Sequence, residues 1–348
     1  MKISTLIEKS LFDDKNGYYK TKNPIGKNAD FITAPEISQI FGELVAVYLL
    51  QISSQSQNKF SLIEMGAGKG TWFKDILQTI NKLAKKNNPQ ALNFLSKAQF
   101  HIIETNPILQ KIQQQNLQNF TINWHKNFSD FLMDKNGEIF FISNELFDCF
   151  AIDQYVKTSE GWCERLVRFD DEKTLKNPQF FLEKFNTKTH DFVEEKVGKF
   201  LSQNAPLNAI FEYSKTAQEF MIKLCKAINE SGGVAINFDY GYSEYDFSNT
   251  LQAVKNHQKI AFFSGLADSD ITAHVDFLAL DKIVKYFGLN SSLITQEQFL
   301  LSLGAQSRVD FLVEKNPQLS REILSGFERL VGENQMGKLF KSHIFWKK

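Results

Sequence analysis

The chain has 348 residues, enough for one large domain or for a domain with a substantial appendage. Lysine plus arginine equals aspartate plus glutamate at 40 each, so no whole-molecule field favours nucleic acid or an anionic membrane, and we expect no nucleic-acid partner. Three widely spaced cysteines exclude a disulfide framework and a CxxC-type zinc site, and they indicate a reducing compartment.

The N-terminal residues 1–9 contain neither the apolar run of a signal peptide nor the arginine-rich composition of a transit peptide, so we expect a cytoplasmic protein. The longest apolar stretch, 44–52, is far shorter than the ~20 residues of a membrane helix, and we expect no membrane span. Residues 35–49 carry apolar side chains at spacings of three and four. With Pro35 in its first turn, this segment predicts one amphipathic helix that leads into the core.

Strands and helices then alternate along the chain. Residues 60–65 predict a buried strand, which a glycine-rich turn joins to a helix over 71–84. The same pattern predicts strands at 100–104, 121–125 and 139–143 and a helix at 107–117, with a polar insertion at 81–99. Alternation of this kind indicates an α/β fold with a parallel sheet and helices on both of its faces.

The pattern changes after residue 154. Two strand-like pieces and a charged stretch predict an inserted subdomain at 155–206. The core resumes with a helix at 214–230, and further elements follow at 234–239, 275–287 and 339–346. We therefore divide the chain into an N-terminal segment (1–40), a core (41–154 and 207–348) and the inserted subdomain.

The turn Gly66-Ala67-Gly68-Lys69-Gly70 lets a ligand lie against bare backbone at the start of a helix. A dinucleotide fingerprint places its third glycine at the sixth position of the motif, which here is Thr71. The observed G-x-G-x-G spacing, preceded by Glu64, suits S-adenosylmethionine, because this cofactor has no pyrophosphate and carries cationic groups. A structural turn without a ligand remains the alternative.

An acid ends the next predicted strand. Glu104 is placed to accept the ribose hydroxyls of an adenosine ligand, and the insertion at 81–99 explains its long spacing from the glycine turn. A solvent-exposed carboxylate at a strand end is the alternative reading.

Asn144, Glu145 and Asp148 follow the fourth predicted strand, at the sheet edge where ligands of open α/β folds bind. The two acids could face the transferable methyl, or Asn144 could cap a helix that carries both acids in its first turn. Asp239 ends the next strand, with the same choice between the cleft and a tight turn. The six histidines show no spacing typical of a metal site, and we expect none.

Seven segments together resemble the MidA-like methyltransferase family, which includes the mitochondrial complex I assembly factor that methylates protein arginine. The segments occur in family order at 30–43 (DFITAPEISQIFGE), 64–71 (EMGAGKGT), 104–107 (ETNP), 144–148 (NELFD), 239–242 (DYGY), 270–277 (DITAHVDF) and 336–341 (MGKLFK). The first of them is far more specific than a glycine motif. Two positions depart from the family pattern, Ala29 and 248–250, and the second departure affects acceptor recognition.

The resemblance implies a Rossmann-like, seven-stranded class I methyltransferase sheet with an inserted subdomain and an N-terminal helical segment that closes the site. From the residues and the resemblance together, we assign cofactor binding to Glu64, Gly66, Ala67, Gly68, Gly70, Thr71, Glu104 and Asn144. We assign catalysis to Glu145, Asp148 and Asp239.

We accordingly expect an S-adenosylmethionine-dependent methyltransferase that modifies an arginine of a partner protein. The resemblance implies a respiratory complex I subunit as the partner. A homodimer of this chain is a further possibility. An assembly or scaffold protein that binds the cofactor without turnover is the main alternative. A nicotinamide-dependent oxidoreductase is a weaker one, because Thr71 occupies the third-glycine position.

Overall fold

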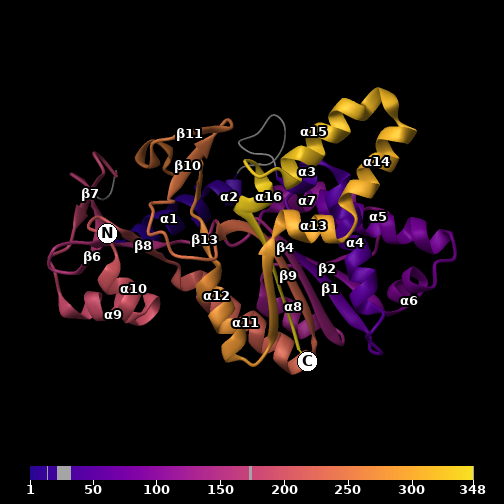
Figure 1. The fold of residues 1–348 in the computed structure, drawn as a ribbon, viewed down its shortest axis with the longest axis horizontal. Coiled ribbons are helices and arrows are strands. Elements are labelled where there is room, and N and C mark those ends of the chain that lie inside the picture. The colour runs from indigo at the N-terminus through magenta and orange to yellow at the C-terminus, as the bar shows by residue number, and fades with distance from the viewer. Residues whose placement is uncertain (14, 22–32, 172–174, 348) are drawn as a thin grey trace.

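The computed structural model describes residues 1–13, 15–21, 33–171 and 175–347. Ala29 and the first three residues of the DFITAPEISQ run therefore lie outside the described residues. A central sheet dominates the structure, and seven of its strands lie side by side in the order β14–β15–β9–β4–β1–β2–β3, with the short β13 paired to β9 (Figure 1). Their bounds are β1 (Phe60–Met65), β2 (Ala98–Ile103), β3 (Asn123–His125), β4 (Glu138–Asn144), β9 (Gly233–Tyr242), β13 (Val275–Asp276), β14 (Asn290–Thr295) and β15 (Phe340–Trp346).

Among the described strands of this sheet, β15 is the one that runs opposite to the rest. It is antiparallel to both β9 and β14, whereas β1, β2, β3, β4, β9 and β13 pair in parallel. The expectation of an α/β fold with a mostly parallel central sheet is confirmed. The sequence patterns missed β14, whose six residues are all partly exposed and give no buried-strand signal.

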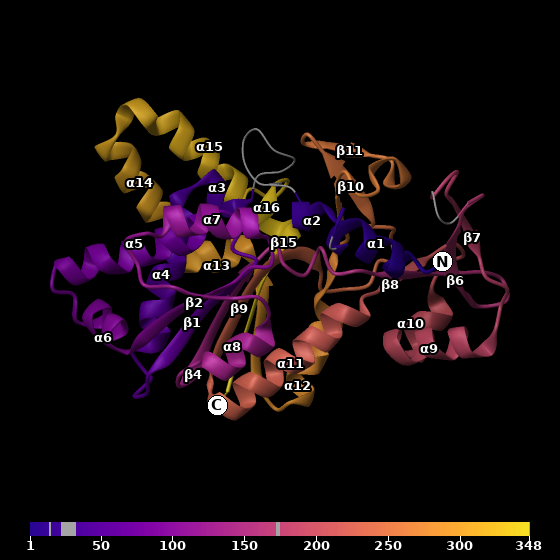
Figure 2. The same cartoon turned by 180° about the vertical axis from the view of Figure 1, so that it is seen from behind.

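Both faces of the sheet are covered, because successive residues of each strand point to opposite sides. Leu62 and Phe140 pack on one side, and Ile63 and Phe141 pack on the other. The first side is covered by α4 (Gln39–Ser53), α5 (Thr71–Lys85), α6 (Pro89–Lys97), α13 (Gln296–Ser302), α14 (Ala305–Lys315) and α15 (Ser320–Val331), and Leu117 at the end of α7 (Pro107–Asn116) joins the same cluster. The second is covered by α8 (Phe128–Asp134), α11 (Lys215–Ser231) and α12 (Phe277–Tyr286), as Figure 2 shows from behind.

The helix expected over 35–49 is two helices, so this prediction is wrong in one detail. A short α3 (Ala34–Ile37) ends at Ser38, whose backbone is extended (φ −157°, ψ 131°). The Ser38 hydroxyl accepts a hydrogen bond from the Ile40 N–H and so caps α4. The break turns α3 toward the ends of the central strands.

Two smaller sheets lie beside the core. Residues 153–213 carry β5 (Asp153–Lys157), β6 (Trp162–Arg168), β7 (Gln179–Leu182) and β8 (Ile210–Tyr213), with α9 (Thr187–Val197) and α10 (Lys199–Asn204). The range 155–206 of our inserted subdomain falls within this span. A three-stranded sheet follows, of β10 (Gln252–Lys255), β11 (Gln258–Ile260) and β12 (Asp270–Thr272), with the 3-10 helix η1 (Phe262–Gly265); the sequence patterns did not predict it.

The N-terminal helix α1 (Ile3–Phe12) packs against both smaller sheets through a shared apolar cluster that includes Leu6, Val167 and Ile271. The Met1 amino group donates to the Val167 carbonyl at 2.7 Å. These contacts bring α2 (Tyr18–Thr21) to the edge of the central sheet. The remaining short helices are η2 (Pro317–Leu319) and α16 (Met336–Leu339).

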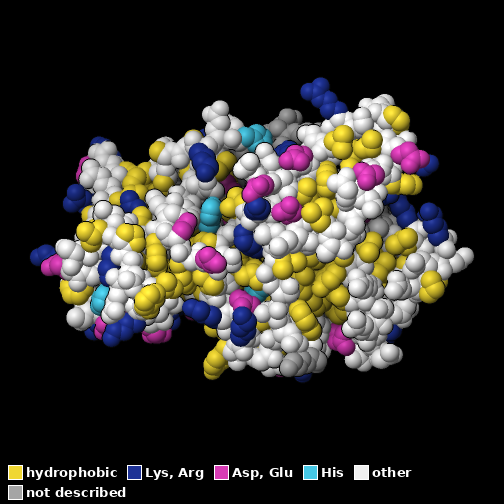
Figure 3. All heavy atoms as spheres, viewed as in Figure 1, with side chains coloured by type: hydrophobic (Ala, Val, Ile, Leu, Met, Phe, Trp, Pro, Cys, Tyr) yellow, Lys and Arg dark blue, Asp and Glu magenta, His cyan; other side chains and the backbone are white. Residues whose placement is uncertain are grey.

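Charged side chains are interspersed on the face shown in Figure 3, and no patch of one sign covers it. This agrees with the zero formal charge of the sequence. Across the described ranges, we find no helix with the length and apolar character needed to cross a membrane.

Candidate active site

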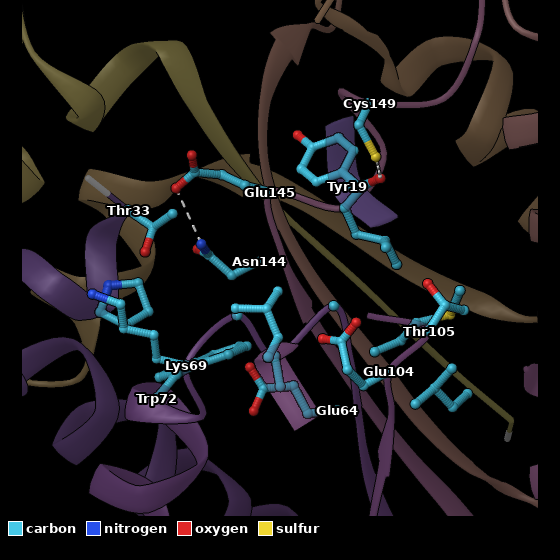
Figure 4. A pocket seen from close by; sticks show the side chains of 18 of the residues that line it. Tyr19, Thr33, Glu64, Lys69, Trp72, Glu104, Thr105, Asn144, Glu145 and Cys149 are labelled. Atoms are coloured by element: carbon cyan, nitrogen blue, oxygen red, sulfur yellow. Dashed lines mark hydrogen bonds between the residues drawn. The ribbon is translucent and has the colours of Figure 1, made fainter. Parts of the chain in front are cut away.

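A pocket of about 330 Å³ lies where β1, β2 and β4 end at their carboxyl edges. The glycine turn, Glu104 and the segment after Asn144 form its floor, while α2, α3 and Asp270 of β12 form its walls. Figure 4 shows the side chains of Glu64 and Glu104 next to each other, with Asn144 and Glu145 on another side of the cavity. Residues from distant parts of the sequence therefore converge at one opening.

The glycine turn needs its glycines. Gly66, Gly68 and Gly70 have φ values of 75°, 52° and 76°, in the left-handed region that side chains with a Cβ disfavour. A Cβ on Gly66 would also lie 3.2 Å from the Leu146 side chain. The Gly70 N–H donates to the Ala67 carbonyl at 2.7 Å, which closes the turn before α5 begins at Thr71.

A buried glutamine that the sequence analysis missed connects the turn to Glu104. The Gln113 amide on α7 donates to the Gly68 carbonyl at 2.8 Å and to the Glu104 carboxylate at 2.9 Å. Its carbonyl oxygen accepts from the Trp124 indole at 3.1 Å. The signal was present in the sequence, because Gln113 lies between Leu109 and Leu117 on the inward face of the helix, where a polar side chain needs a partner.

Glu64 lies on β1 with only 2% of its surface exposed, and its Oε2 has no hydrogen-bond partner. Burial, reinforced by the nearby Glu104 charge, raises the pKa of Glu64 to about 8. Burial also raises the pKa of Glu104, against the lowering effect of hydrogen bonds from the Asn106 N–H and from Gln113. Two carboxyl groups thus share this side of the pocket, and Lys20 favours the ionised form of Glu104 only weakly against the effect of burial.

Asn144, Glu145 and Asp148 all line the pocket, but no helix follows β4, so the alternative of a helix cap at Asn144 is wrong. Glu145 has a φ of 51°, a strained value for a side chain with a Cβ. Its carboxylate accepts from the Asn144 amide at 3.1 Å and from the Ala34 N–H of α3. Asn144 Oδ1 has no partner.

The acids of this loop titrate near neutral pH. Burial, with a contribution from Asp148, raises the pKa of Glu145 to about 8. Burial raises the pKa of Asp148 to about 6, although the Tyr240 hydroxyl donates to its carboxylate and opposes the rise. Both groups can therefore exchange a proton under physiological conditions.

Asp239 lies behind this loop and is not part of the pocket lining. Its Oδ2 accepts hydrogen bonds from the N–H groups of Leu146, Phe147 and Asp148 at 3.0, 2.7 and 3.2 Å. The geometry therefore assigns Asp239 to holding the loop in shape, rather than to contact with a bound molecule.

The N-terminal segment contributes directly to the walls. The Thr71 hydroxyl donates to the Glu36 carboxylate of α3 at 2.5 Å, and the Tyr19 hydroxyl donates to Asp270 at 2.5 Å. Tyr19 lies beside Cys149 in Figure 4. The segment 248–250, which departs from the family pattern, lies elsewhere: the Thr250 hydroxyl bonds to Glu212 and accepts from the His274 N–H.

The pocket is strongly acidic. Among the described residues, six carboxylates line it and two lysines, Lys20 and Lys69, oppose them. The acids are Glu36, Glu64, Glu104, Glu145, Asp148 and Asp270. Because burial raises the cost of uncompensated charge, this lining favours a cationic occupant. The unpartnered oxygens of Glu64 and Asn144 are free acceptors for its donor groups.

Comparison with known proteins agrees with this chemistry. A family model described as "Putative S-adenosyl-L-methionine-dependent methyltransferase" matches residues 44–295. Among curated proteins, the chain is 27% identical to protein arginine methyltransferase NDUFAF7, mitochondrial, of Xenopus tropicalis, over 97% of this chain and 80% of the relative. The same protein of Homo sapiens is 25% identical, over 97% of this chain and 78% of the relative.

A solved structure shares the whole fold. It is a protein from Burkholderia thailandensis with bound S-adenosyl-homocysteine, and it is 22% identical with a TM-score of 0.81, covering 100% of this chain and 88% of the other. The curated relatives are named as mitochondrial proteins. This finding contradicts our expectation of a cytoplasmic protein, which is therefore wrong; the short N-terminal stretch was too weak a basis for it.

Proposed function

This chain belongs to the S-adenosyl-L-methionine-dependent methyltransferase family, and we propose that it methylates an arginine side chain of a partner protein. The observation that supports the proposal most directly is the acidic pocket described above, since both the cofactor and the guanidinium group of an arginine are cationic. The names of the curated relatives support the same acceptor.

The residues present fit the cofactor. The positive-φ glycines leave bare backbone on which it can lie, Glu64 offers an unpaired carboxylate oxygen for its ammonium group, and Glu104 offers acceptors for its ribose hydroxyls. When bound, S-adenosylmethionine supplies a methyl group on a sulfonium, which is an electrophile that needs no acid catalyst. The task that remains for the protein is alignment, and proximity supplies as much as ~7–11 kcal/mol.

We propose that Glu145 and Asp148 orient the acceptor and receive its proton. A guanidinium has a pKa above ~12, so its nitrogen is a poor nucleophile until it loses a proton as the new bond forms. Asp148, with a pKa of about 6, is mostly ionised at pH 7 and can accept that proton. Glu145, with a pKa of about 8, is mostly protonated in the empty pocket, and it loses this proton once a cation in the pocket lowers its pKa.

We extend the proposal to a respiratory complex subunit as the partner, and its support is the motif resemblance; the relatives are named as mitochondrial, which agrees with such a partner. A homodimer remains a prediction, which light scattering of the purified protein would check.

Labelled-methyl transfer tests the proposed function. The purified protein is incubated with S-adenosylmethionine labelled at its methyl group and an extract of cells that lack the protein, and labelled bands are hydrolysed to identify the modified amino acid. Asp148→Asn should keep cofactor affinity and lower kcat by about 10²–10⁴. Asp310→Asn, at an exposed position on α14, is the matched control and should behave as the unsubstituted chain.

Methylarginine in one protein band would support the proposal and supply the partner. Label on a different residue would refute arginine as the acceptor. Cofactor binding without any labelled product would instead favour the scaffold alternative.

A further inference from the structure

Three side chains that are metal ligands in many proteins meet outside the pocket. His101 on β2, His125 on β3 and Asp134 on α8 offer ligand atoms that all lie within 4.8 Å of one another. His101 Nδ1 is 2.9 Å from His125 Nε2, and the same Nε2 is 3.7 Å from Asp134 Oδ2. No sequence motif predicts this group, because its members are brought together by strand pairing and by the helix after β3.

A hydrogen bond between the two rings accounts for only part of this arrangement. The two facing nitrogens share one proton, whichever ring donates it. The Asp134 carboxylate therefore faces His125 Nε2, which already donates or accepts the hydrogen bond to His101. The other nitrogen of the buried His101 ring, Nε2, has no hydrogen-bond partner. A cation between the three groups would be shared by all of them.

We propose that His101, His125 and Asp134 bind a divalent transition metal ion such as Zn²⁺. Two imidazoles and a carboxylate are a typical ligand set for this class of ion, and Zn–N distances of ~2.0–2.1 Å in a tetrahedral site place two ligand nitrogens about 3.3 Å apart. To reach that geometry the two nitrogens separate from 2.9 Å by a few tenths of an ångström, the shared proton moves to the other nitrogen of its ring, and the Asp134 oxygen closes from 3.7 Å. The His101 and His125 side chains are 0% and 7% exposed, whereas that of Asp134 is 59% exposed, so the ion enters from the Asp134 side.

The position of this metal site gives it a role in the pocket. β3 is an edge strand of three residues, and it carries both His125 and Trp124, whose indole holds Gln113 against the glycine turn and Glu104. The His125 carbonyl also accepts from the Glu104 N–H at 3.0 Å. A metal that holds His125 against β2 and α8 therefore also holds Trp124 and Gln113, which position the glycine turn and Glu104. We expect metal binding to raise both the thermal midpoint and the cofactor affinity.

Zinc titration of the full chain, after treatment with a chelator, tests the proposal. Competition with a chromophoric chelator should show one Zn²⁺ per chain, and Co²⁺ should give a visible absorption band of tetrahedral intensity. Asp134→Asn and His125→Ala should each weaken Zn²⁺ binding by about tenfold or more. The control is His257→Asn, which removes an exposed histidine between β10 and β11 and keeps a residue type that tolerates its positive φ.

Because Asp134 is exposed, Asp134→Asn should fold even where His125→Ala does not. The proposal is overturned if the unsubstituted chain binds no more Zn²⁺ than Asp134→Asn does, or if His257→Asn alone removes the binding. A zinc-dependent rise of the thermal midpoint in the control, absent in Asp134→Asn, would support it.

Discussion

Substitution of Glu64 by glutamine tests the electrostatic account of the pocket. The Glu64 carboxyl has a pKa of about 8 in the free protein, so at pH 6 to 7 it is mostly protonated. A positive charge about 4 Å away, at an effective dielectric constant of ~20, stabilises the carboxylate by about 4 kcal/mol, which would lower its pKa by about 3 units. Cofactor binding then releases a proton, and the affinity must rise with pH up to about 8.

The size of the effect follows from these two pKa values. With a pKa of about 8 in the free protein and about 5 in the complex, the affinity rises on the order of 50-fold between pH 6 and pH 8. Glu64→Gln has no charge to gain, so its deficit should grow from about tenfold at pH 6 to about 500-fold at pH 8 by the same arithmetic. The ratio of the two proteins is the informative quantity, because titration of the ligand's own amino group affects both equally.

Calorimetric titration at pH 6, 7 and 8, in buffers of different ionisation enthalpy, measures both the affinity and the released proton. A deficit of Glu64→Gln that stays constant across this range would show that Glu64 does not titrate on binding. An unchanged affinity at pH 8 would remove Glu64 from the cofactor site.

Three further substitutions test the parts of the site separately. Gly68→Ala places a Cβ at φ 52°, which costs about 1–2 kcal/mol in the turn conformation that binds the cofactor. A calorimetric titration should therefore show a cofactor affinity about 5- to 30-fold lower, with the fold kept. An unaltered affinity would contradict the placement of the ligand on this turn. Gln113→Leu leaves the Gly68 carbonyl and the Glu104 carboxylate without this hydrogen-bond donor, at a cost of about 1–3 kcal/mol, and should lower both the thermal midpoint and the cofactor affinity. The control Gln114→Leu, at an exposed position, should change neither. Glu145 binds its proton more tightly in the folded chain, where its pKa is about 8, than in the unfolded chain, where it is an ordinary 4.5, so its contribution to the free energy of unfolding is lost as pH rises through this window at about 1.4 kcal/mol per unit. Relative to the unsubstituted chain, Glu145→Gln should therefore gain on the order of 2 kcal/mol in free energy of unfolding between pH 5.5 and pH 7.5. Equal pH profiles of chemical unfolding for the two proteins would refute this.

The strands and helices that carry the cofactor-side residues could be predicted because their signals are local. The strand at Phe60–Met65, the glycine turn and the helix from Thr71 follow from a buried run, the spacing of glycines and helical periodicity. The break at Ser38 did carry a local signal, an N-cap serine, which the prediction of one continuous helix overlooked. The strand β14 gave no such signal, because all six of its residues are partly exposed.

The roles of single residues divide in the same way. Glu145 and Asp148 could be placed at the carboxyl edge of the sheet from the position of the strand before them. The position of Asp239 behind the loop could not be predicted, because it depends on hydrogen bonds from three backbone N–H groups more than 90 residues away in the sequence. The group of His101, His125 and Asp134 required the pairing of β2 with β3, which the sequence indicates only in outline.

The acids of the pocket are held together at a cost to the empty protein. Burial of Glu64 and Glu145 raises the pKa of each to about 8, so each carboxyl either keeps its proton or places an uncompensated charge in the interior. A protein stabilised only by its own contacts would gain from replacing such groups with neutral ones. A cationic ligand removes the penalty, so the same residues that weaken the empty fold at high pH strengthen the complex there. Stabilisation by S-adenosylmethionine should therefore grow with pH, and the acidic lining is best understood as a site whose charge is completed by what it binds.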